Sequence, residues 1–214
     1  MKAVFFDLDG TLIDSLDDLA GAVNTVLAGA GYAEHPVDAY KYFIGDGMET
    51  LLRRAAPSDI DDNVYLHLLD VLREEYARSW AGKTRLYPGI ASMLAGLEEE
   101  GIILAILSNK PHEFALVTVE HFFPDTPFAI VQGSPRGSRA KPDPALALSI
   151  TRSLGLEPAE VLFMGDSGTD MKTAVAAGML PVGVLWGFRT AEELTAHGAR
   201  ALLERPEQVF DLVR

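Results

Sequence analysis

The stretch that decides the fold lies near the start of the chain, where residues 5–15 read FFDLDGTLIDS. An apolar run, Val4–Phe6, leads directly into Asp7, and a second acid, Asp9, follows two positions later and precedes Gly10. Asp and Gly are common turn residues, so this stretch by itself is equally compatible with an ordinary turn. The positions of polar residues in the rest of the chain are needed to separate a turn from a functional site.

Four later segments are similar in character to the first apolar run. They are short, apolar and mostly rich in β-branched or aromatic residues, which favours buried strands. Amphipathic stretches lie between them, and several end at a glycine, the common residue just past a helix. Alternating strands and helices predict a parallel sheet with helices on its faces. The expected strands are Val4–Phe6, Ile102–Leu107, Phe128–Val131, Val161–Met164 and Pro181–Leu185, and the expected helices include Ile90–Glu100, Ala145–Leu154 and Thr169–Ala177.

The interval from Asp14 to about Leu86 interrupts this alternation and contains no convincing strand. Its amphipathic stretches have helical spacing, with Asp and Ser near their starts. These stretches are Leu16–Leu27, Met48–Ala55 and Asp61–Trp80. The pattern predicts an α/β fold with a Rossmann-like parallel-sheet core, formed by residues 1–14 and 86–214, into which residues 15–85 are inserted as a helical domain.

Polar side chains follow the expected strands at the point where each strand ends. Asp7 comes directly after the first strand, and Asp166 closely follows the fourth. Ser108 and Asn109 follow the second strand, and Lys141 closes the loop after the third. Because open parallel sheets bind ligands at the carboxyl ends of their strands, we expect these side chains to gather at one edge. Each residue alone could belong to a turn or a helix start, but their shared position favours a site.

The expected edge is rich in carboxylates, which are Asp7, Asp9, Asp166 and Asp170. Like charges so close together raise one another's pKa unless a cation is bound. Oxygen ligands without His or Cys favour Mg²⁺ over zinc. We therefore expect Asp7 and Asp166 to offer carboxylates to Mg²⁺ and Asp9 to offer its backbone carbonyl. The bound cation would let an anionic phosphate approach.

The same residues suit phosphoryl transfer. A carboxylate can attack phosphorus, and Asp7 is the expected nucleophile because it ends a rigid strand. Asp9 would protonate the leaving oxygen and later take a proton from water. Ser108 and Asn109, with the backbone amides nearby, would bind the phosphoryl oxygens, and Lys141 would neutralise their charge.

Four motifs therefore occur in order, each after an expected strand. They are Asp7-Leu8-Asp9-Gly10-Thr11-Leu12, Ser108-Asn109, Lys141 in Lys-Pro-Asp-Pro, and Gly165-Asp166-Ser167-Gly168-Thr169-Asp170. Together they resemble the haloacid dehalogenase superfamily, in its phosphatase branch, and the likeness spans nearly the whole chain, the helical insertion being similar to that family's cap domain. The resemblance implies Mg²⁺-dependent phosphoryl transfer through a phosphorylated Asp7. It also implies that Asp166 contacts the metal and that Asp170 lies just outside the metal's ligands.

A closer likeness is carried by a second set of residues. They are Ser108-Asn109-Lys110-Pro111, Lys141-Pro142-Asp143-Pro144-Ala145, Ala176-Ala177-Gly178, Trp186-Gly187-Phe188 and Gly45-Asp46-Gly47. In these the chain is similar to phosphoglycolate phosphatases, which implies a small phosphorylated metabolite as substrate. The loop of Gly45, Asp46 and Gly47 is expected to face the site and contact the leaving group, with an ordinary turn as the alternative. The stretch Gly133–Arg139 departs from the family's pattern.

Composition limits the possible partners. The chain has 31 acidic and 18 basic residues, a formal net charge of −13 and a pI near 4.7. This acid excess repels phosphate backbones and anionic lipids, so no nucleic acid or membrane partner is expected. The absence of cysteine fits a reducing compartment, and no apolar run is long enough for a signal peptide or a membrane span. We expect a cytoplasmic protein that is a monomer or a homodimer.

Three functions remain compatible with these residues. The first is a phosphatase for small phosphate monoesters. The second uses the same site as a pyrophosphatase or a sugar-phosphate mutase. The third is a phosphate-binding or partner-binding protein without catalysis, which the presence of both Asp7 and Asp9 disfavours.

Overall fold

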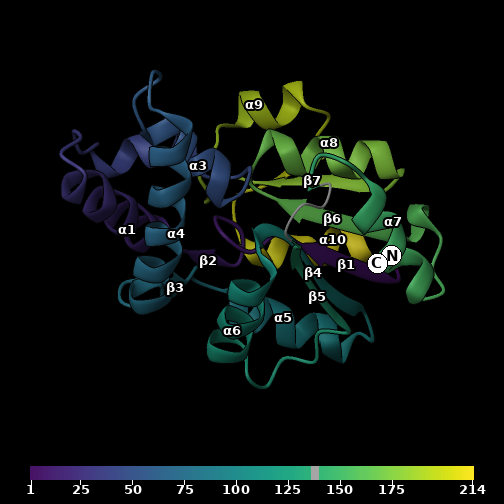
Figure 1. Cartoon of the computed structure of the whole chain (residues 1–214). Coiled ribbons are helices and arrows are strands. Elements are labelled where there is room, and N and C mark those ends of the chain that lie inside the picture. The colour runs from purple at the N-terminus through teal and green to yellow at the C-terminus, as the bar shows by residue number, and fades with distance from the viewer. Residues whose placement is uncertain (136–139) are drawn as a thin grey trace.

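The computed structural model describes residues 1–135 and 140–214. Within these residues six strands form one sheet in the order β5-β4-β1-β6-β7-β8, and every neighbouring pair is parallel (Figure 1). The predicted α/β fold class is therefore confirmed. The strands are β1 (Ala3–Phe6), β4 (Ile103–Pro111), β5 (Ile130–Ser134), β6 (Val161–Gly165), β7 (Leu180–Val184) and β8 (Ala201–Leu203).

Helices cover both faces of this sheet, so its central strands are buried on both sides. Val4 and Phe6 pack with α5, α6 and α10 on one face. Ala3 and Phe5 pack with α7 and α8 on the other. This double burial explains why the strands read as continuous apolar runs rather than as alternating ones. The helices of this part are α5 (Ile90–Glu99), α6 (His112–Phe122), α7 (Ala145–Ser153), α8 (Gly168–Ala177), α9 (Ala191–Ala196) and α10 (Phe210–Val213), with short 3₁₀ turns at Pro158–Glu160 and Pro206–Val209.

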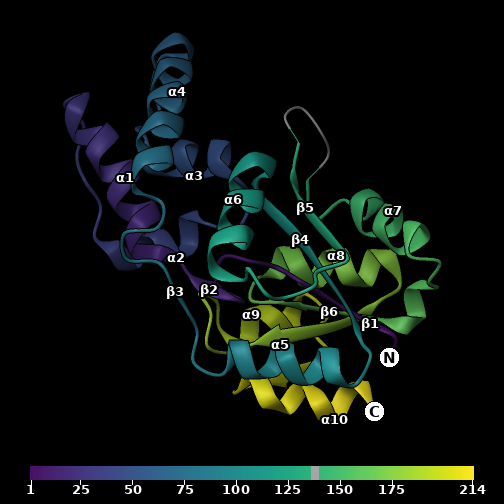
Figure 2. The ribbon, with the colours of Figure 1, turned by 90° about the horizontal axis from the view of Figure 1, so that it is seen from below.

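The inserted segment forms a helical layer beside the sheet and has a hydrophobic cluster of its own (Figures 1 and 2). Its helices are α1 (Leu16–Gly29), α2 (Tyr40–Phe43), α3 (Met48–Ala55) and α4 (Asp62–Ser79), with a 3₁₀ turn at Val37–Ala39. Asp61 caps α4 by accepting hydrogen bonds from the backbone of Asn63 and Val64. On this separate core we propose that residues 15–85 are a cap domain over a core of residues 1–14 and 86–214.

The two connections between cap and core run side by side. β2 (Ile13–Asp14) and β3 (Arg85–Leu86) form a short antiparallel pair. The sequence shows no convincing strand between Asp14 and Leu86, and these two-residue strands lie at the very ends of that interval. Asp18 of α1 secures the second connection, because its carboxylate accepts hydrogen bonds from Lys83 N, Thr84 N and Thr84 Oγ1.

Several boundaries differ from the sequence-based expectation. β4 continues four residues past Leu107, and β5 begins at Ile130 instead of Phe128. Phe128 packs edge-on against Phe123. Its ring therefore packs on the hydrophobic core, although the residue precedes the strand. Helix α6 and strand β8 were not predicted. The Val-Thr-Val run of α6 weakens its helical signal, and β8 is only three residues long.

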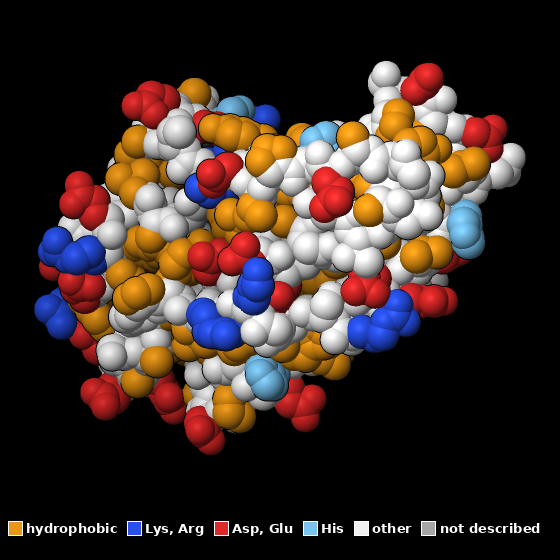
Figure 3. All heavy atoms as spheres, turned by 90° about the vertical axis from the view of Figure 1, so that its left-hand side faces the viewer, with side chains coloured by type: hydrophobic (Ala, Val, Ile, Leu, Met, Phe, Trp, Pro, Cys, Tyr) orange, Lys and Arg blue, Asp and Glu red, His pale blue; other side chains and the backbone are white. Residues whose placement is uncertain are grey.

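The remaining expectations concern the surface. Of the unusual stretch Gly133–Arg139, residues 136–139 lie outside the described part of the chain. Over the described ranges, no helix combines the length and the apolar character needed to cross a bilayer. Figure 3 views the molecule from the cap side and shows side chains of both charges spread between hydrophobic ones.

Candidate active site

Asp7 and Asp166 meet at the carboxyl edge of the sheet. β1 and β6 are parallel neighbours with Phe6 opposite Met164, so the residues that follow these strands lie side by side. Asp7, Asp166 and Asp170 each place one carboxylate oxygen within 4.8 Å of the others, and all three are buried. The structure thus brings Asp7 together with two acids that lie more than 150 positions later in the sequence.

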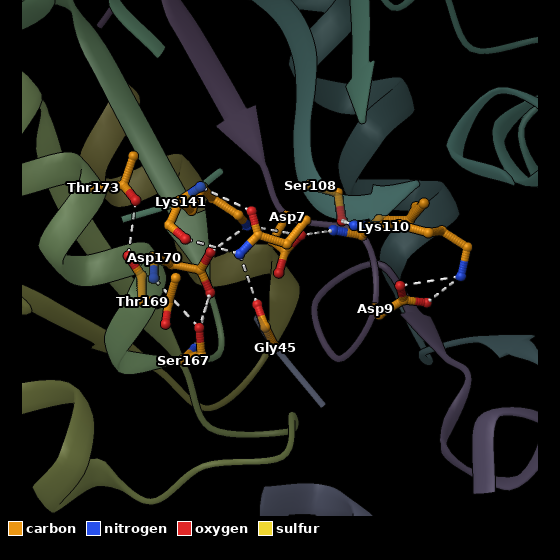
Figure 4. A network of polar contacts seen from close by, with 12 residues as sticks. Asp7, Asp9, Gly45, Ser108, Lys110, Lys141, Ser167, Thr169, Asp170 and Thr173 are labelled. Carbon is orange, nitrogen blue, oxygen red and sulfur yellow. Dashed lines mark hydrogen bonds and ion pairs between the residues drawn. The ribbon is translucent and has the colours of Figure 1, made fainter. Parts of the chain in front are cut away.

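Lys141 lies against this cluster. Its Nζ is 2.9 Å from Asp7 Oδ1 and 2.5 Å from Asp170 Oδ1 (Figure 4). Its backbone N–H donates to Asn109 Oδ1 at 2.9 Å, which fixes the end of the loop before it. Burial alone would lower the pKa of Lys141, but the charges of Asp170 and Asp7 outweigh it and raise that pKa. Lys141 is therefore a permanent cation beside Asp7.

Both oxygens of Asp170 already accept protein donors. Oδ1 binds Lys141, while Oδ2 accepts from Ser167 N at 3.0 Å and from Ser167 Oγ at 2.6 Å. The Ser167–Asp170 pair forms the capping box of α8, so Asp170 is held by the start of that helix. This arrangement favours Asp170 as the residue that positions Lys141 and favours the other two acids as ligands of a cation.

Asp7 and Asp166 each keep one oxygen available. Asp7 Oδ1 accepts from Leu8 N at 2.7 Å and from Lys141, and Asp166 Oδ2 accepts from Phe188 N at 2.8 Å. Among the described residues, no donor reaches the second oxygen of either acid. Two carboxylate oxygens without donors in a buried, acidic place are what a hard divalent cation requires.

Two glycines allow the chain to close around Asp166. A Cβ at Gly10 would lie 2.3 Å from Asp166 Oδ2, and one at Gly187 would lie 2.3 Å from Asp166 Cβ. Gly10 also has a backbone φ of +85°, a value that residues other than glycine rarely adopt. The glycine of the first motif is thus needed for close approach and for its backbone conformation.

The acids influence one another's protonation. Burial raises the pKa of Asp7 to about 6, with Lys141 opposing that rise and Asp170 adding to it. Burial, Asp170 and Asp7 together raise the pKa of Asp166 well above its ordinary value. A cation between the two acids would relieve this repulsion, so the residues present fit the expected Mg²⁺.

Asp9 points away from this cluster. Its carboxylate accepts from Ser15 Oγ at 2.6 Å and from Lys110 Nζ at 2.9 and 3.1 Å, and Figure 4 shows the Lys110 pair to one side of Asp7. Lys110 also donates to the hydroxyl of Tyr76 at 2.6 Å. Burial raises the pKa of Tyr76 to about 12, so this partner is neutral.

Lys110 and Tyr76 are absent from the predicted site residues. Lys110 stands in the quoted Ser108-Asn109-Lys110 motif, and its place directly after two site residues was the available signal. Tyr76 lies in the last turn of cap helix α4, where an aromatic residue is typical of an apolar face. Only the packing of the cap on the core shows that its hydroxyl reaches the site.

Ser108 and Asn109 lie in different surroundings. Ser108 is buried at the cavity wall, and its Oγ accepts from Lys110 N at 3.3 Å. The Asn109 amide group donates to Gly45 O at 2.9 Å and to Lys141 O at 3.1 Å, and its Oδ1 accepts from Lys141 N. Because an amide group has only two N–H donors, this side chain is committed to the protein, and the predicted phosphate contact of Asn109 would have to come from its backbone.

The cap loop lies directly on the core. Besides the Gly45–Asn109 bond, Asp46 Oδ1 accepts from Thr169 Oγ1 at 2.7 Å and Asp46 Oδ2 pairs with Arg54 at 2.5 Å. Although burial opposes it, these donors lower the pKa of Asp46. Gly45 and Gly47 line the cavity beside Asp7, whereas Asp46 turns outward to Thr169 and Arg54.

A cavity of about 40 Å³ lies between cap and core. Polar residues form its core side, and apolar side chains form much of its cap side. This space admits a few water-sized groups, and the hydrogen bonds of Gly45 and Asp46 hold the cap loop on the core. The polar lining residues are Asp7, Asp9, Ser108, Asn109 and Lys110 of the core and Tyr76 of the cap, and the apolar side chains of the cap are Leu19, Ile44, Met48 and Leu51.

Comparison with known proteins agrees with this geometry. The family model of the haloacid dehalogenase-like hydrolases matches residues 4–184. A phosphoglycolate phosphatase of Pseudomonas putida is 34% identical over all of this chain and 77% of its own length. A crystal structure of a protein from Lactobacillus delbrueckii subsp. bulgaricus superposes with a TM-score of 0.92 and 29% identity, covering 99% of this chain and 98% of that one.

A second crystal structure, of a predicted phosphoglycolate phosphatase from Haemophilus somnus 129pt, has a TM-score of 0.91 and 25% identity and covers 100% of this chain and 98% of that one. The matched family and the full-length relatives agree in class. The chain belongs to the haloacid dehalogenase-like hydrolases and is a phosphoric monoester hydrolase similar to phosphoglycolate phosphatases.

Proposed function

We propose that this chain is a Mg²⁺-dependent phosphatase that hydrolyses a small phosphorylated metabolite, similar to phosphoglycolate, through a phosphorylated Asp7. One observation carries the proposal. Asp7 and Asp166 each keep a carboxylate oxygen that accepts from no donor in the described part of the chain, and Lys141 lies 2.9 Å from Asp7. A nucleophile, the ligands for a cation and a fixed positive charge therefore share one buried place.

Asp7 and Asp166 would hold Mg²⁺ through their carboxylates, with the backbone carbonyl of Asp9 as a further oxygen ligand. When bound, the ion supplies positive charge that offsets both the acids and the phosphate. Asp170 does not join the ligands, because its two oxygens serve Lys141 and Ser167.

The remaining chemistry belongs to the chain's own side chains. A carboxylate oxygen of Asp7 forms the new bond to phosphorus while the bond to the leaving oxygen breaks. Asp9 gives that oxygen a proton and, in the second half of the reaction, takes a proton from the water that attacks the phosphorylated Asp7. Lys141 and Ser108 bind the phosphoryl oxygens as their negative charge develops.

The closed cap suits two demands of this chemistry. Water must be kept from the first step and admitted in the second, which a hinged cap achieves. The small cavity and the apolar cap residues that line it favour a small leaving group. A small metabolite, rather than a protein or a nucleic acid, is the proposed substrate.

Hydrolysis of 2-phosphoglycolate and p-nitrophenyl phosphate, measured with Mg²⁺ and again after addition of EDTA, tests the proposal. We expect activity only with Mg²⁺. Asp7→Asn is expected to lose activity and keep its fold, and Asp59→Asn, at an exposed loop position, serves as the matched control. Undiminished turnover by Asp7→Asn would refute the nucleophile.

A second variant addresses proton transfer. Asp9→Asn keeps the shape of the side chain but has no proton to give, so we expect kcat to fall by about two to four orders of magnitude. The loss should be smaller for p-nitrophenyl phosphate, whose leaving group needs little protonation. Equal losses on both substrates would contradict the role of Asp9 as the acid.

A further inference from the structure

The side chain of Asn109 joins the cap loop to the segment that carries Lys141, a role that the phosphoryl-transfer steps above do not use. Its amide nitrogen donates to Gly45 O of the cap at 2.9 Å and to Lys141 O at 3.1 Å. Its Oδ1 accepts from Lys141 N at 2.9 Å. Asn109 is buried, with 5% of its surface exposed, so these bonds form away from bulk water.

The three partners of this amide allow one orientation. Two carbonyl oxygens need N–H donors and one N–H needs an acceptor, so an inverted amide would bring like groups together at all three contacts. Both N–H groups of the amide are used, one on Gly45 and one on Lys141. A movement of Gly45 away from the core therefore breaks one of the three bonds that hold the amide in place.

The cap loop reaches Asn109 through its main chain. A Cβ at Gly47 would lie 3.3 Å from Asn109 O, a close approach that a larger residue at this position would disturb. Asn109 in turn directly follows Ser108, which lines the cavity beside Asp7. The backbone of the cap loop thus lies against the end of β4 at the site itself.

The position of Lys141 matters because its ammonium group lies beside the proposed nucleophile. Its Nζ is 2.9 Å from Asp7 Oδ1. Asn109 contacts both the N–H and the carbonyl of Lys141, so it fixes the backbone from which this side chain extends. A displacement of about 1 Å in a group that must be placed for catalysis can cost roughly a hundredfold in rate.

We propose, on the basis of the phosphatase function above, that Asn109 is a positioning residue that makes the placement of Lys141 depend on closure of the cap. With the cap loop seated, all three bonds form and Lys141 is held beside Asp7. When the loop lifts, Asn109 loses Gly45 O and holds the backbone of Lys141 less firmly. The site is completed while the cap covers it, and by reciprocity a fixed Lys141 favours the closed cap.

Steady-state kinetics on 2-phosphoglycolate test the positioning role. Asn109→Ala removes all three bonds and leaves every charged group of the site in place. We expect kcat to fall by about ten- to a hundredfold, because Lys141 is displaced. KM should rise by about fivefold, because the cap loses one hydrogen bond to the core. An unchanged kcat would overturn the proposal.

Asn24→Ala is the matched control, because this amide also makes three hydrogen bonds but makes them within the cap. It donates to His35 O at 2.9 Å and accepts from His35 N at 3.0 Å and from the hydroxyl of Tyr40 at 2.6 Å. Its loss should lower the melting temperature and leave kcat unchanged. An equal fall in kcat in both variants would mean that a loosened fold causes the loss, and the role of Asn109 would be overturned.

Amide hydrogen exchange, followed by NMR without substrate, tests the coupling and leaves Asn109 intact, in case Asn109→Ala does not fold. Asp46→Ala loosens the cap loop, and the bonds that it removes go to Thr169 and Arg54. We expect the Lys141 amide, which donates to Asn109, to exchange several-fold faster in this variant than in the wild type. The amide of Phe163, at the centre of β6, should keep its rate and so exclude a general loss of stability.

The two measurements separate this inference from the proposed function. Unchanged exchange at Lys141 in Asp46→Ala would show that the cap loop and Lys141 move independently, and it would overturn the coupling even if the enzyme is a phosphatase. If the wild type hydrolyses no phosphate ester, the phosphatase proposal fails, while the exchange rates still decide whether Lys141 follows the cap loop.

Discussion

At the scale of single residues, the buried position of Asp166 suits its proposed role as a metal ligand but lowers the stability of the fold. The buried side chain lies close to Asp7 and Asp170, and these surroundings raise its pKa well above the ordinary value of 3.8. The folded chain therefore binds this proton more tightly than the unfolded chain does. As pH rises from about 4 through the raised pKa, the contribution of Asp166 to stability falls, and above it the buried charge opposes folding.

Asp166→Asn should therefore melt at a higher temperature than the wild type in EDTA at pH 8, by a few degrees. At pH 3 the difference should shrink, because the acid is then largely protonated in both states. Mg²⁺ should raise the melting temperature of the wild type but not that of the variant. Calorimetry at both pH values checks this, and a variant that is less stable than the wild type in EDTA at pH 8 would count against the repulsion described here.

At the scale of elements, the loop between α2 and α3 fastens the cap to the core. Asp46 receives a hydrogen bond from Thr169 of α8, and Arg54 of α3 holds the same carboxylate in place. Arg189 adds a bond to the carbonyl of Ile44 at 2.8 Å. These contacts favour closure of the cap over the core, although the side chain of Asp46 does not enter the cavity.

We expect Asp46→Ala to lower kcat/KM for 2-phosphoglycolate by roughly ten- to a hundredfold, since a hydrogen bond to a charged group is typically worth about 1.5–3 kcal/mol. Most of the change should appear in KM, because the acids of the core are untouched. Asp38→Ala removes an exposed cap carboxylate that pairs with Lys41 and is the matched control. Steady-state kinetics that show no difference between the two variants would exclude the loop from closure.

At the scale of the whole molecule, one core residue links the cap's hydrophobic cluster to the acids. Phe188 is 7% exposed and belongs to the cap's cluster, while its backbone N–H donates to Asp166. Cap packing and the position of a proposed metal ligand thus depend on the same residue. Phe123 is similarly buried but packs on the face of the sheet covered by α5 and α6.

Phe188→Ala and Phe123→Ala should each lower the free energy of unfolding by about 3–5 kcal/mol, as is usual for a buried phenylalanine. Only Phe188→Ala should also raise KM, because it alone loosens the cap against the core. Thermal melts combined with kinetics on 2-phosphoglycolate distinguish the two effects. Equal KM values in the two variants would show that cap packing and substrate binding are independent.

Much of the fold and of the site follows from local patterns. Asp7 and Asp166 could be paired in advance, because parallel strands carry whatever follows them to one edge of the sheet. Lys141 was found by the same argument. The weaker predictions concern short or irregular pieces, such as β8 and the start of β5, where three or four residues carry little periodic signal.

The sequence by itself determined the layered α/β core, the inserted helices and the acids at the strand ends, because side-chain periodicity and the chemistry of a motif are local properties. Only the tertiary structure decided which partners those residues take. Lys110 meets Tyr76 across 34 positions, and Asp46 meets Thr169 across 123. Such contacts depend on how cap and core pack together, and that packing sums many small, long-range terms that no local stretch contains.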